Sequence, residues 1–179
     1  MSNNENIAPI IEAVRENNNE KLSAWLYDST MSNNLIGEAL IECVIWKKKA
    51  STKLILDTFA NDQTKLAAIL IHQDKEQRRN VFHHMLLQEN NIEIFESIVQ
   101  VLHNLPTKEQ ITICTSCDND GKTPLHLGMH PRYYNRFKLS RFFNSLNEET
   151  KEIVVNYPDT QTKQTLGHLA KRIGCDLFN

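Results

Sequence analysis

The chain has 179 residues, of which 40% are hydrophobic and 23% charged, which is typical of a folded globular protein and argues against disorder. Its formal net charge of -2 gives no overall attraction to nucleic acid or to an anionic membrane, and no apolar stretch reaches the roughly 18 residues of a membrane span. The five glycines and five prolines supply little turn chemistry for a many-stranded sheet, so the composition favours helices.

The first part of the chain predicts two pairs of helices and a short fifth one. Ile7–Glu16 and Asn19–Tyr27 are amphipathic and are separated by an asparagine-rich turn. Residues 34–46 and 51–60 form the second pair, joined by a run of three lysines. A short helix is expected next, near 62–72.

The middle of the chain repeats this order. Asn80–Gln88 is dense in apolar residues, as expected of an inner helix, and Ile92–Leu102 has a broad apolar face at helical spacing. A short helix is expected at about 107–115. Thr107 and Gln110 have the spacing of a capping box, in which the threonine hydroxyl accepts one amide of the first turn and the glutamine reaches back.

The segment Pro131–Phe143 interleaves four cations with five aromatic residues. We expect an amphipathic helix here, with Phe137 and Phe142 in the core and the cations outside. These cations are Arg132, Arg136, Lys138 and Arg141. A last short helix is expected near 148–156, followed by an inner helix.

Several sequence markers recur at a spacing of about 43 residues, which indicates a repeat protein. The first marker is a Thr-Lys pair, at Thr64, Thr107 and Thr150. A polar residue follows each pair by 15 or 16 positions, with a histidine three positions further: Asn80 and His83, Thr123 and His126, Thr165 and His168. Core-type residues keep the same step, at Leu56, Val99 and Phe142.

The stretch Asp118–Leu127, DNDGKTPLHL, resembles the ankyrin-repeat signature. Gly121 permits a turn with positive φ, Pro124 suits the first turn of a helix, and the threonine and histidine can hydrogen-bond at the helix start. Residues 165–170 resemble a degraded copy, and residues 80–83 a weaker one.

The resemblance implies an all-α fold, an ankyrin-like helical repeat solenoid. Its units of about 43 residues exceed the usual period of about 33 by one extra short helix. We expect a single ankyrin-repeat domain over residues 1–179, with units at approximately 5–28, 34–73, 78–115, 118–156 and 159–179. An armadillo- or HEAT-type solenoid, with a period of about 40–47 residues, is the structural alternative.

Two cysteines and two histidines offer a different chemistry. Cys114 and Cys117, followed by His126 and His130, have the ligand order of a zinc finger. The central spacer has 8 residues against about 12 in the usual finger, and His126 already belongs to the ankyrin-like stretch. We therefore expect no metal and no cofactor. No nucleophile elbow or phosphate-binding loop accompanies the cysteines, so we expect no enzyme.

The resemblance implies a protein–protein interaction module that binds a partner protein through its concave surface of finger tips and inner helices. Carried over position by position, the binding residues are Glu76, Gln77, Arg79, Gln88, Asn119, Asp120, Lys122, His130, Gln161, Thr162, Gln164 and Arg172. The alternative is a zinc- or nucleic-acid-binding repeat protein, since the cations and aromatics of residues 131–143 are what single-strand binders use. We expect a monomer that contacts neither nucleic acid nor membrane.

Short, divergent ankyrin proteins resemble effectors that intracellular bacteria deliver into host cells, or viral mimics of host inhibitors. The Asn-, Lys- and Ile-rich composition fits an AT-rich genome and favours a host-targeting effector with a role in virulence. Four cysteines do not form a disulfide scaffold in a chain of this length, so a cytoplasmic location is expected, in the host if the protein is secreted.

Overall fold

The structure is a computed structural model that describes residues 8–28, 30–88, 92–132 and 135–174. The prediction of an all-α fold is confirmed, because every regular element in these ranges is a helix. The β-type pairing found there is a single bridge between Pro158 and Thr165. None of the helices in this part of the chain is long and apolar enough to cross a membrane.

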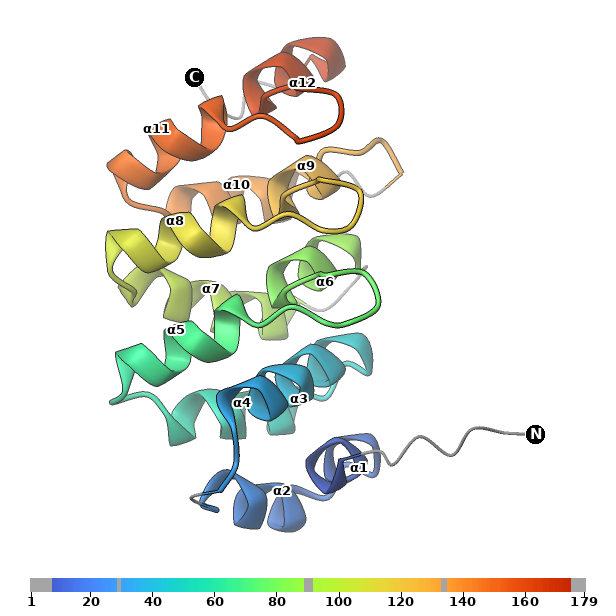
Figure 1. The fold of residues 1–179 in the computed structure, drawn as a ribbon, viewed down its shortest axis with the longest axis vertical. Helices are drawn as coiled ribbons and strands as arrows, with labels where there is room; N and C mark the ends of the chain where they lie inside the picture. The colour runs from blue at the N-terminus through green and yellow to red at the C-terminus, as the bar shows by residue number, and fades with distance from the viewer. Residues whose placement is uncertain (1–7, 29, 89–91, 133–134, 175–179) are drawn as a thin grey trace, which may run out of the picture.

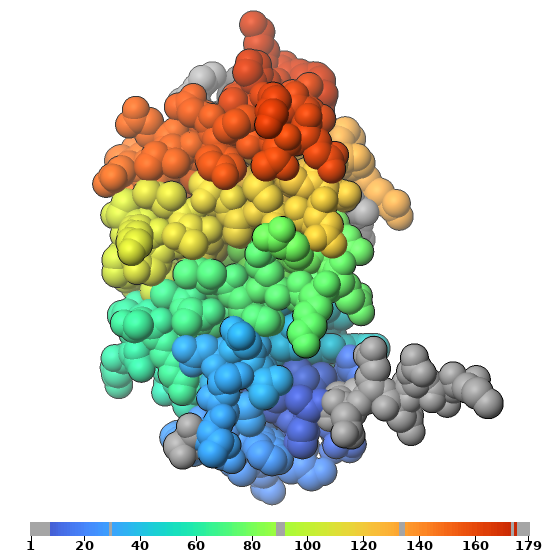
Figure 2. All heavy atoms as spheres, in the orientation of Figure 1, coloured from blue at the N-terminus to red at the C-terminus, as the bar shows by residue number. Residues whose placement is uncertain are grey.

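The helices stand in three columns, and each helix contacts the members of its own column above and below it (Figure 1). The first column contains α1 (Pro9–Arg15), α3 (Asn33–Ile45), α6 (Val81–Leu87), α9 (Pro124–Gly128) and α12 (Leu166–Ile173). The second contains α2 (Asn19–Leu26), α4 (Lys49–Thr58), α7 (Ile92–Asn104) and α10 (Arg136–Ser145). The third contains α5 (Gln63–Ile71), α8 (Thr107–Thr115) and α11 (Glu148–Asn156). Figure 2 shows the same succession as layers along the long axis of the molecule.

The first two helix pairs are closed by the same kind of turn. Asn17 and Lys47, which follow α1 and α3, both have positive φ, at 58° and 56°. The next amide in each turn donates to a carbonyl five residues back, from Asn18 to Ala13 at 2.9 Å and likewise after α3. This is the bonding of a left-handed helix C-terminus, which reverses the chain tightly into the second column.

The predicted capping box at the start of α8 is wrong. The Gln110 side chain is buried and its Nε2 donates to the carbonyl of Leu105 at 3.0 Å, while its Oε1 accepts the amide of Asn147 at 3.1 Å. The Thr107 hydroxyl accepts from Nδ2 of Asn147 at 2.9 Å. Both residues therefore join α8 to the start of α11 in the next layer, and this contact between layers takes the place of the local cap.

The core runs the length of the stack and contains Leu56, Val99 and Phe142, as predicted. The ring of Phe142, on α10, stacks on that of Phe82, on α6, with centroids 5.2 Å apart. This contact joins the first column to the second.

The predicted orientation of α10 is wrong at two adjacent positions. Phe137 is 51% exposed, whereas Lys138 is 2% exposed. The buried face of α10 is formed by Leu139, Phe142 and Phe143, and at 100° per residue Lys138 falls beside them while Phe137 points the opposite way. The helix period therefore places the cation inside and the aromatic ring outside.

Candidate functional site

Three loops that precede α6, α9 and α12 have the same internal construction, and we call them finger loops: residues 74–80, 118–123 and 159–165. They lie one above another on the same side of the molecule (Figure 1). Each begins with a buried aspartate whose amide donates to the carbonyl of the residue just before the following helix cap. These bonds run from Asp74 to Arg79 at 2.9 Å, from Asp118 to Lys122 at 3.0 Å and from Asp159 to Gln164 at 2.9 Å.

The aspartate carboxylates hold the finger loops from inside by accepting backbone amides. Asp74 accepts from Gln77 at 2.7 Å, Asp118 from Asp120 at 2.9 Å and Asp159 from Gln161 at 2.9 Å. Burial opposes ionisation of Asp74 and Asp159, but the hydrogen bonds they accept outweigh it, so the pKa of each carboxyl lies below its ordinary value. Both carboxylates are therefore charged at neutral pH.

Each finger loop contains one residue in the left-handed region, two positions before the helix cap. These residues are Arg78, Gly121 and Lys163, with φ of 54°, 70° and 58°. A Cβ atom at Gly121 would lie 1.9 Å from Oγ1 of Thr160 in the next finger loop, so glycine is required by close approach as well as by φ. The predicted positive φ at Gly121 is confirmed, and the other two loops adopt the same turn without glycine.

A histidine links each finger loop to its helix, as predicted. Thr123 caps α9 by accepting the amide of His126, and its hydroxyl lies 2.7 Å from Nδ1 of the same histidine. Asn80 with His83 and Thr165 with His168 form the same arrangement at α6 and α12. The repeated polar and histidine markers of the sequence are thus helix caps.

The same histidines also join one finger loop to the next. Nε2 of His83 donates to the carbonyl of Lys122 at 3.1 Å, and Nε2 of His126 donates to the carbonyl of Gln164 at 3.0 Å. Direct backbone bonds reinforce these links, such as that from Thr160 to Gly121 at 3.0 Å. These bonds hold the finger loops at a fixed spacing. A rigid surface of this kind loses less conformational entropy when a partner binds.

The electrostatics of these groups do not favour the zinc or nucleophile interpretations. Both ring nitrogens of His126 are engaged in hydrogen bonds, which leaves neither free to bind a metal ion. Burial lowers the pKa of the ring, which makes it a weaker base for activating a thiol. Burial also raises the pKa of the Cys114 and Cys117 thiols, the opposite of what a reactive thiolate needs. Within the described residues, no three histidine, cysteine or acidic side chains come together as a metal site would require.

The twelve residues predicted to bind a partner form what we call the binding strip, and they differ in exposure. Eight are exposed: Glu76, Gln77, Asn119, Asp120, His130, Gln161, Thr162 and Arg172. Four are partly buried: Arg79, Gln88, Lys122 and Gln164. The guanidinium of Arg79 lies 3.2 Å from the buried carboxylate of Asp118, so this residue supports the finger loops.

Five binding-strip residues come together around a hollow of about 160 Å³ near the C-terminal end of the stack. They are Lys122, His130, Thr162, Gln164 and Arg172. The hollow is also lined by Met129 and Leu169, which are 2% and 8% exposed. Sequence reasoning missed these two because their apolar side chains carried only the signal of a helix core.

An exposed tryptophan in the first column was also missed. Trp46 is the C-cap residue of α3, as Gln88 is of α6, and it is 56% exposed. Its indole Nε1 donates to the carboxylate of Glu42 at 2.6 Å, which in turn accepts from Arg15 at 2.6 Å. A fixed, exposed tryptophan is a residue type often found at the centre of protein interfaces.

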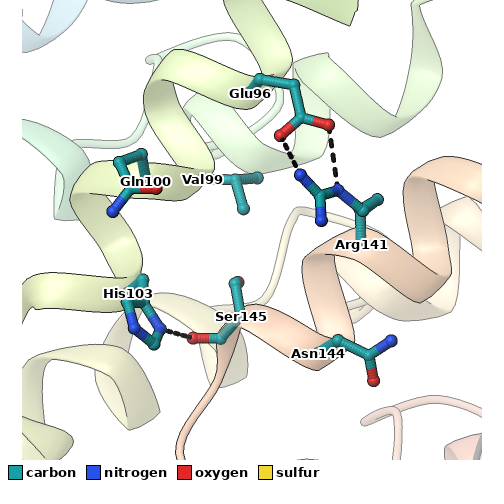
Figure 3. Close-up of a pocket in the computed structure, with 7 residues that line it drawn as sticks. All are labelled: Glu96, Val99, Gln100, His103, Arg141, Asn144 and Ser145. Carbon is teal, nitrogen blue, oxygen red and sulfur yellow. Dashed lines mark hydrogen bonds and ion pairs between the residues drawn. The ribbon is translucent and has the colours of Figure 1, made fainter.

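A second hollow, of about 210 Å³, lies between α7 and α10 in the second column (Figure 3). Arg141 crosses it to Glu96 through two bonds of 3.0 and 2.8 Å, and Nδ1 of His103 donates to the carbonyl of Ser145 at 2.9 Å. Of the cations predicted for nucleic-acid binding, Arg141 is thus paired and Lys138 is buried. The tyrosines of this segment, residues 133 and 134, lie outside the described part of the chain.

Comparison with known proteins adds no family to this description. Neither protein-family models, nor curated proteins, nor solved structures yield a match to the chain. Over its described residues, the structure defines an all-helical class of protein, with three helix columns and three stacked finger loops.

Proposed function

We propose that the protein is a divergent ankyrin-type repeat protein that binds another protein through the binding strip and catalyses no reaction. The observation that supports this proposal is the repeated construction of the three finger loops, whose backbones are bonded to one another. Polar side chains on a rigid, regularly spaced backbone provide a preorganised surface for recognition.

The repeat assignment belongs to the same proposal. In a repeat solenoid each unit contacts its neighbours and the units together form one extended binding face. The contacts between helices agree with this expectation, because each helix touches the helix of its own column in the adjacent layer. A single domain with five units, delivery into a host cell and a cytoplasmic site of action stay predictions from the resemblance.

The composition of the strip favours a protein partner over nucleic acid. It contains carboxylates, cations and amides, exemplified by Asp120, Lys122 and Gln161, whereas a nucleic-acid surface is predominantly cationic. On the second column, the Arg141 guanidinium is already neutralised by Glu96. Both observations support recognition of a polar protein surface.

A charge-reversal experiment tests this function. The variant Glu76→Lys, Lys122→Glu, Arg172→Glu changes the strip and leaves out Arg79, since a carboxylate there would face Asp118. The matched control, Lys53→Glu, Lys108→Glu, Glu152→Lys, makes the same net change at exposed positions of the second and third columns. Both variants should nearly keep the melting temperature, because five of the six changed residues are exposed and the sixth, Lys122, is only partly buried. Charges at such positions contribute little to stability.

Partner capture from a host-cell extract is the measurement, with bound proteins identified by mass spectrometry. We expect a protein retained by the unmodified chain and by the control variant, but not by the strip variant. Equal retention by the strip variant, or loss with the control variant alone, would place the interface elsewhere and contradict the proposal.

A further inference from the structure

The hollow near the C-terminal end of the stack combines an apolar floor with a cationic rim. Its apolar lining comes from Met129, the C-cap residue of α9, and from Leu169 on α12. Thr162 and Gln164, which carry hydrogen-bonding groups, line the same hollow. The finger loop 159–165 forms one wall. A ligand that fits must therefore bring both an apolar group and a polar group.

Two cations from different layers lie at this hollow. Lys122 comes from the finger loop 118–123 and Arg172 from α12. Neither forms an ion pair with a carboxylate of the described residues, and the guanidinium of Arg172 instead donates to Oε1 of Gln164 at 3.2 Å. Exposed Lys163 and Lys171 belong to the same loop and helix and add to the positive potential.

The one acidic side chain that lines the hollow is turned toward its own loop. The carboxylate of Asp159 accepts the amides of Gln161 and Thr162 and the Thr162 hydroxyl, and the residue is 4% exposed. Its hydrogen-bonding capacity is used inside the finger loop, so it neither pairs with the rim cations nor presents an open acceptor to a ligand.

We propose that this hollow binds an acidic linear segment of the partner protein, with a carboxylate between Lys122 and Arg172 and a neighbouring aliphatic side chain on Met129 and Leu169. This inference rests on the proposed function and specifies the chemistry of the partner. A peptide is favoured over a nucleic acid because the apolar residues Met129 and Leu169 that line the hollow are aliphatic, whereas bases stack on aromatic rings. The charge-assisted hydrogen bonds of the carboxylate supply orientation and most of the affinity. The small exposed apolar area of Met129 and Leu169 adds a weaker contact.

Nuclear magnetic resonance with the full chain tests the inference. The probes are two blocked hexapeptides, one of alternating glutamate and leucine, the other with lysine in place of glutamate, and an oligouridine. We expect the acidic peptide to shift the backbone amides of Lys122, Gln164 and Leu169, and to bind more weakly as salt is raised. The lysine peptide should bind at least about tenfold more weakly, since like charges repel.

A matched pair of variants separates this site from general charge. Lys122→Gln with Arg172→Gln should weaken the acidic peptide by about tenfold or more, while Lys53→Gln with Lys108→Gln, which removes the same charge, should leave its affinity unchanged. Equal shifts from both peptides, unchanged binding to the first variant, or stronger binding of oligouridine at the same amides would overturn the inference.

The two proposals fail in different ways. If the acidic peptide does not bind while the strip variant still loses its captured partner, the acidic-segment inference is wrong and the proposed function stands. If the peptide binds the hollow but partner capture is insensitive to the strip, the partner interface lies elsewhere and the hollow is a separate peptide site.

Discussion

At the scale of single residues, the three finger-loop histidines share a sequence position but differ in burial. His83 is 0% and His126 4% exposed, whereas His168 is exposed. The first two lie beneath a following finger loop, and no further finger loop follows His168 within residues 135–174. Burial is therefore set by position in the stack, and sequence reasoning could predict the local cap but not the acceptor carbonyl 38 or 39 residues away.

This burial predicts that stability depends on pH. Burial lowers the pKa of His83 to about 3 from its ordinary 6.5, and lowers that of His126 as well. Between pH 3 and pH 6.5, the His83 ring is protonated in the unfolded chain but not in the folded one. The free energy of unfolding therefore decreases as pH falls below about 6.5. At pH 5 the loss from His83 alone is about 2 kcal/mol relative to pH 7.

Urea unfolding at pH 7 and pH 5 measures this loss. The difference between the two pH values should shrink in His83→Gln and persist in His103→Gln, which changes an exposed histidine of α7. Asp74 and Asp159, with lowered pKa, begin to lose their contribution only below about pH 4, outside this window. An unchanged pH dependence in His83→Gln would show that other groups dominate.

At the scale of helices, the end of α6 depends on a cation from another column. Nζ of Lys138, on α10, donates to the carbonyls of Met85 and Gln88 and lies 5.8 Å from the ring centroid of Phe95. The last carbonyls of a helix have no partner within it and are stabilised by a nearby positive charge. The buried lysine therefore fixes where α6 ends against α10.

We expect Lys138→Met to lower the free energy of unfolding by about 1–3 kcal/mol, because two helix-end carbonyls lose their donor. Phe137→Ala, at the adjacent but exposed position, should cost less than about 1 kcal/mol. Urea unfolding midpoints at pH 7 provide the measurement. A Lys138→Met protein as stable as the original would mean that water or the remaining groups satisfy these carbonyls.

The sequence predicted where the helices lie better than it predicted which side chains contact one another between helices. The short helix expected at about 107–115 and that expected near 148–156 coincide with α8 and α11, because apolar spacing and turn residues are local signals. Gln110 and Lys138 were misassigned because their partners lie in another layer or column. The sequence predicted the polar residues of the binding strip. It did not predict the apolar part of the hollow, because that part forms only where α9 and α12 meet.

At the scale of the whole molecule, the contacts run mainly between adjacent layers. Column neighbours such as α6 and α9 or α8 and α11 touch, and so do helices of the same layer such as α3 and α4. A fold built from such contacts loses stability locally, because a defect affects its own layer and the neighbours most. The proposed repeat solenoid therefore makes a prediction about where unfolding spreads.

Leu125→Ala tests how far a defect spreads. Leu125 is 1% exposed on α9, so the cavity left by truncation should cost about 2–5 kcal/mol. Hydrogen exchange measured by mass spectrometry should then rise in α9 and in its neighbours α6 and α12, while α1 and α3 keep their protection. Ile153→Ala, at a 37% exposed position of α11, serves as the control and should change exchange little. Equal loss of protection from α1 to α12 would instead mean that the stack unfolds as one unit, because the layers would then be coupled too strongly to open separately.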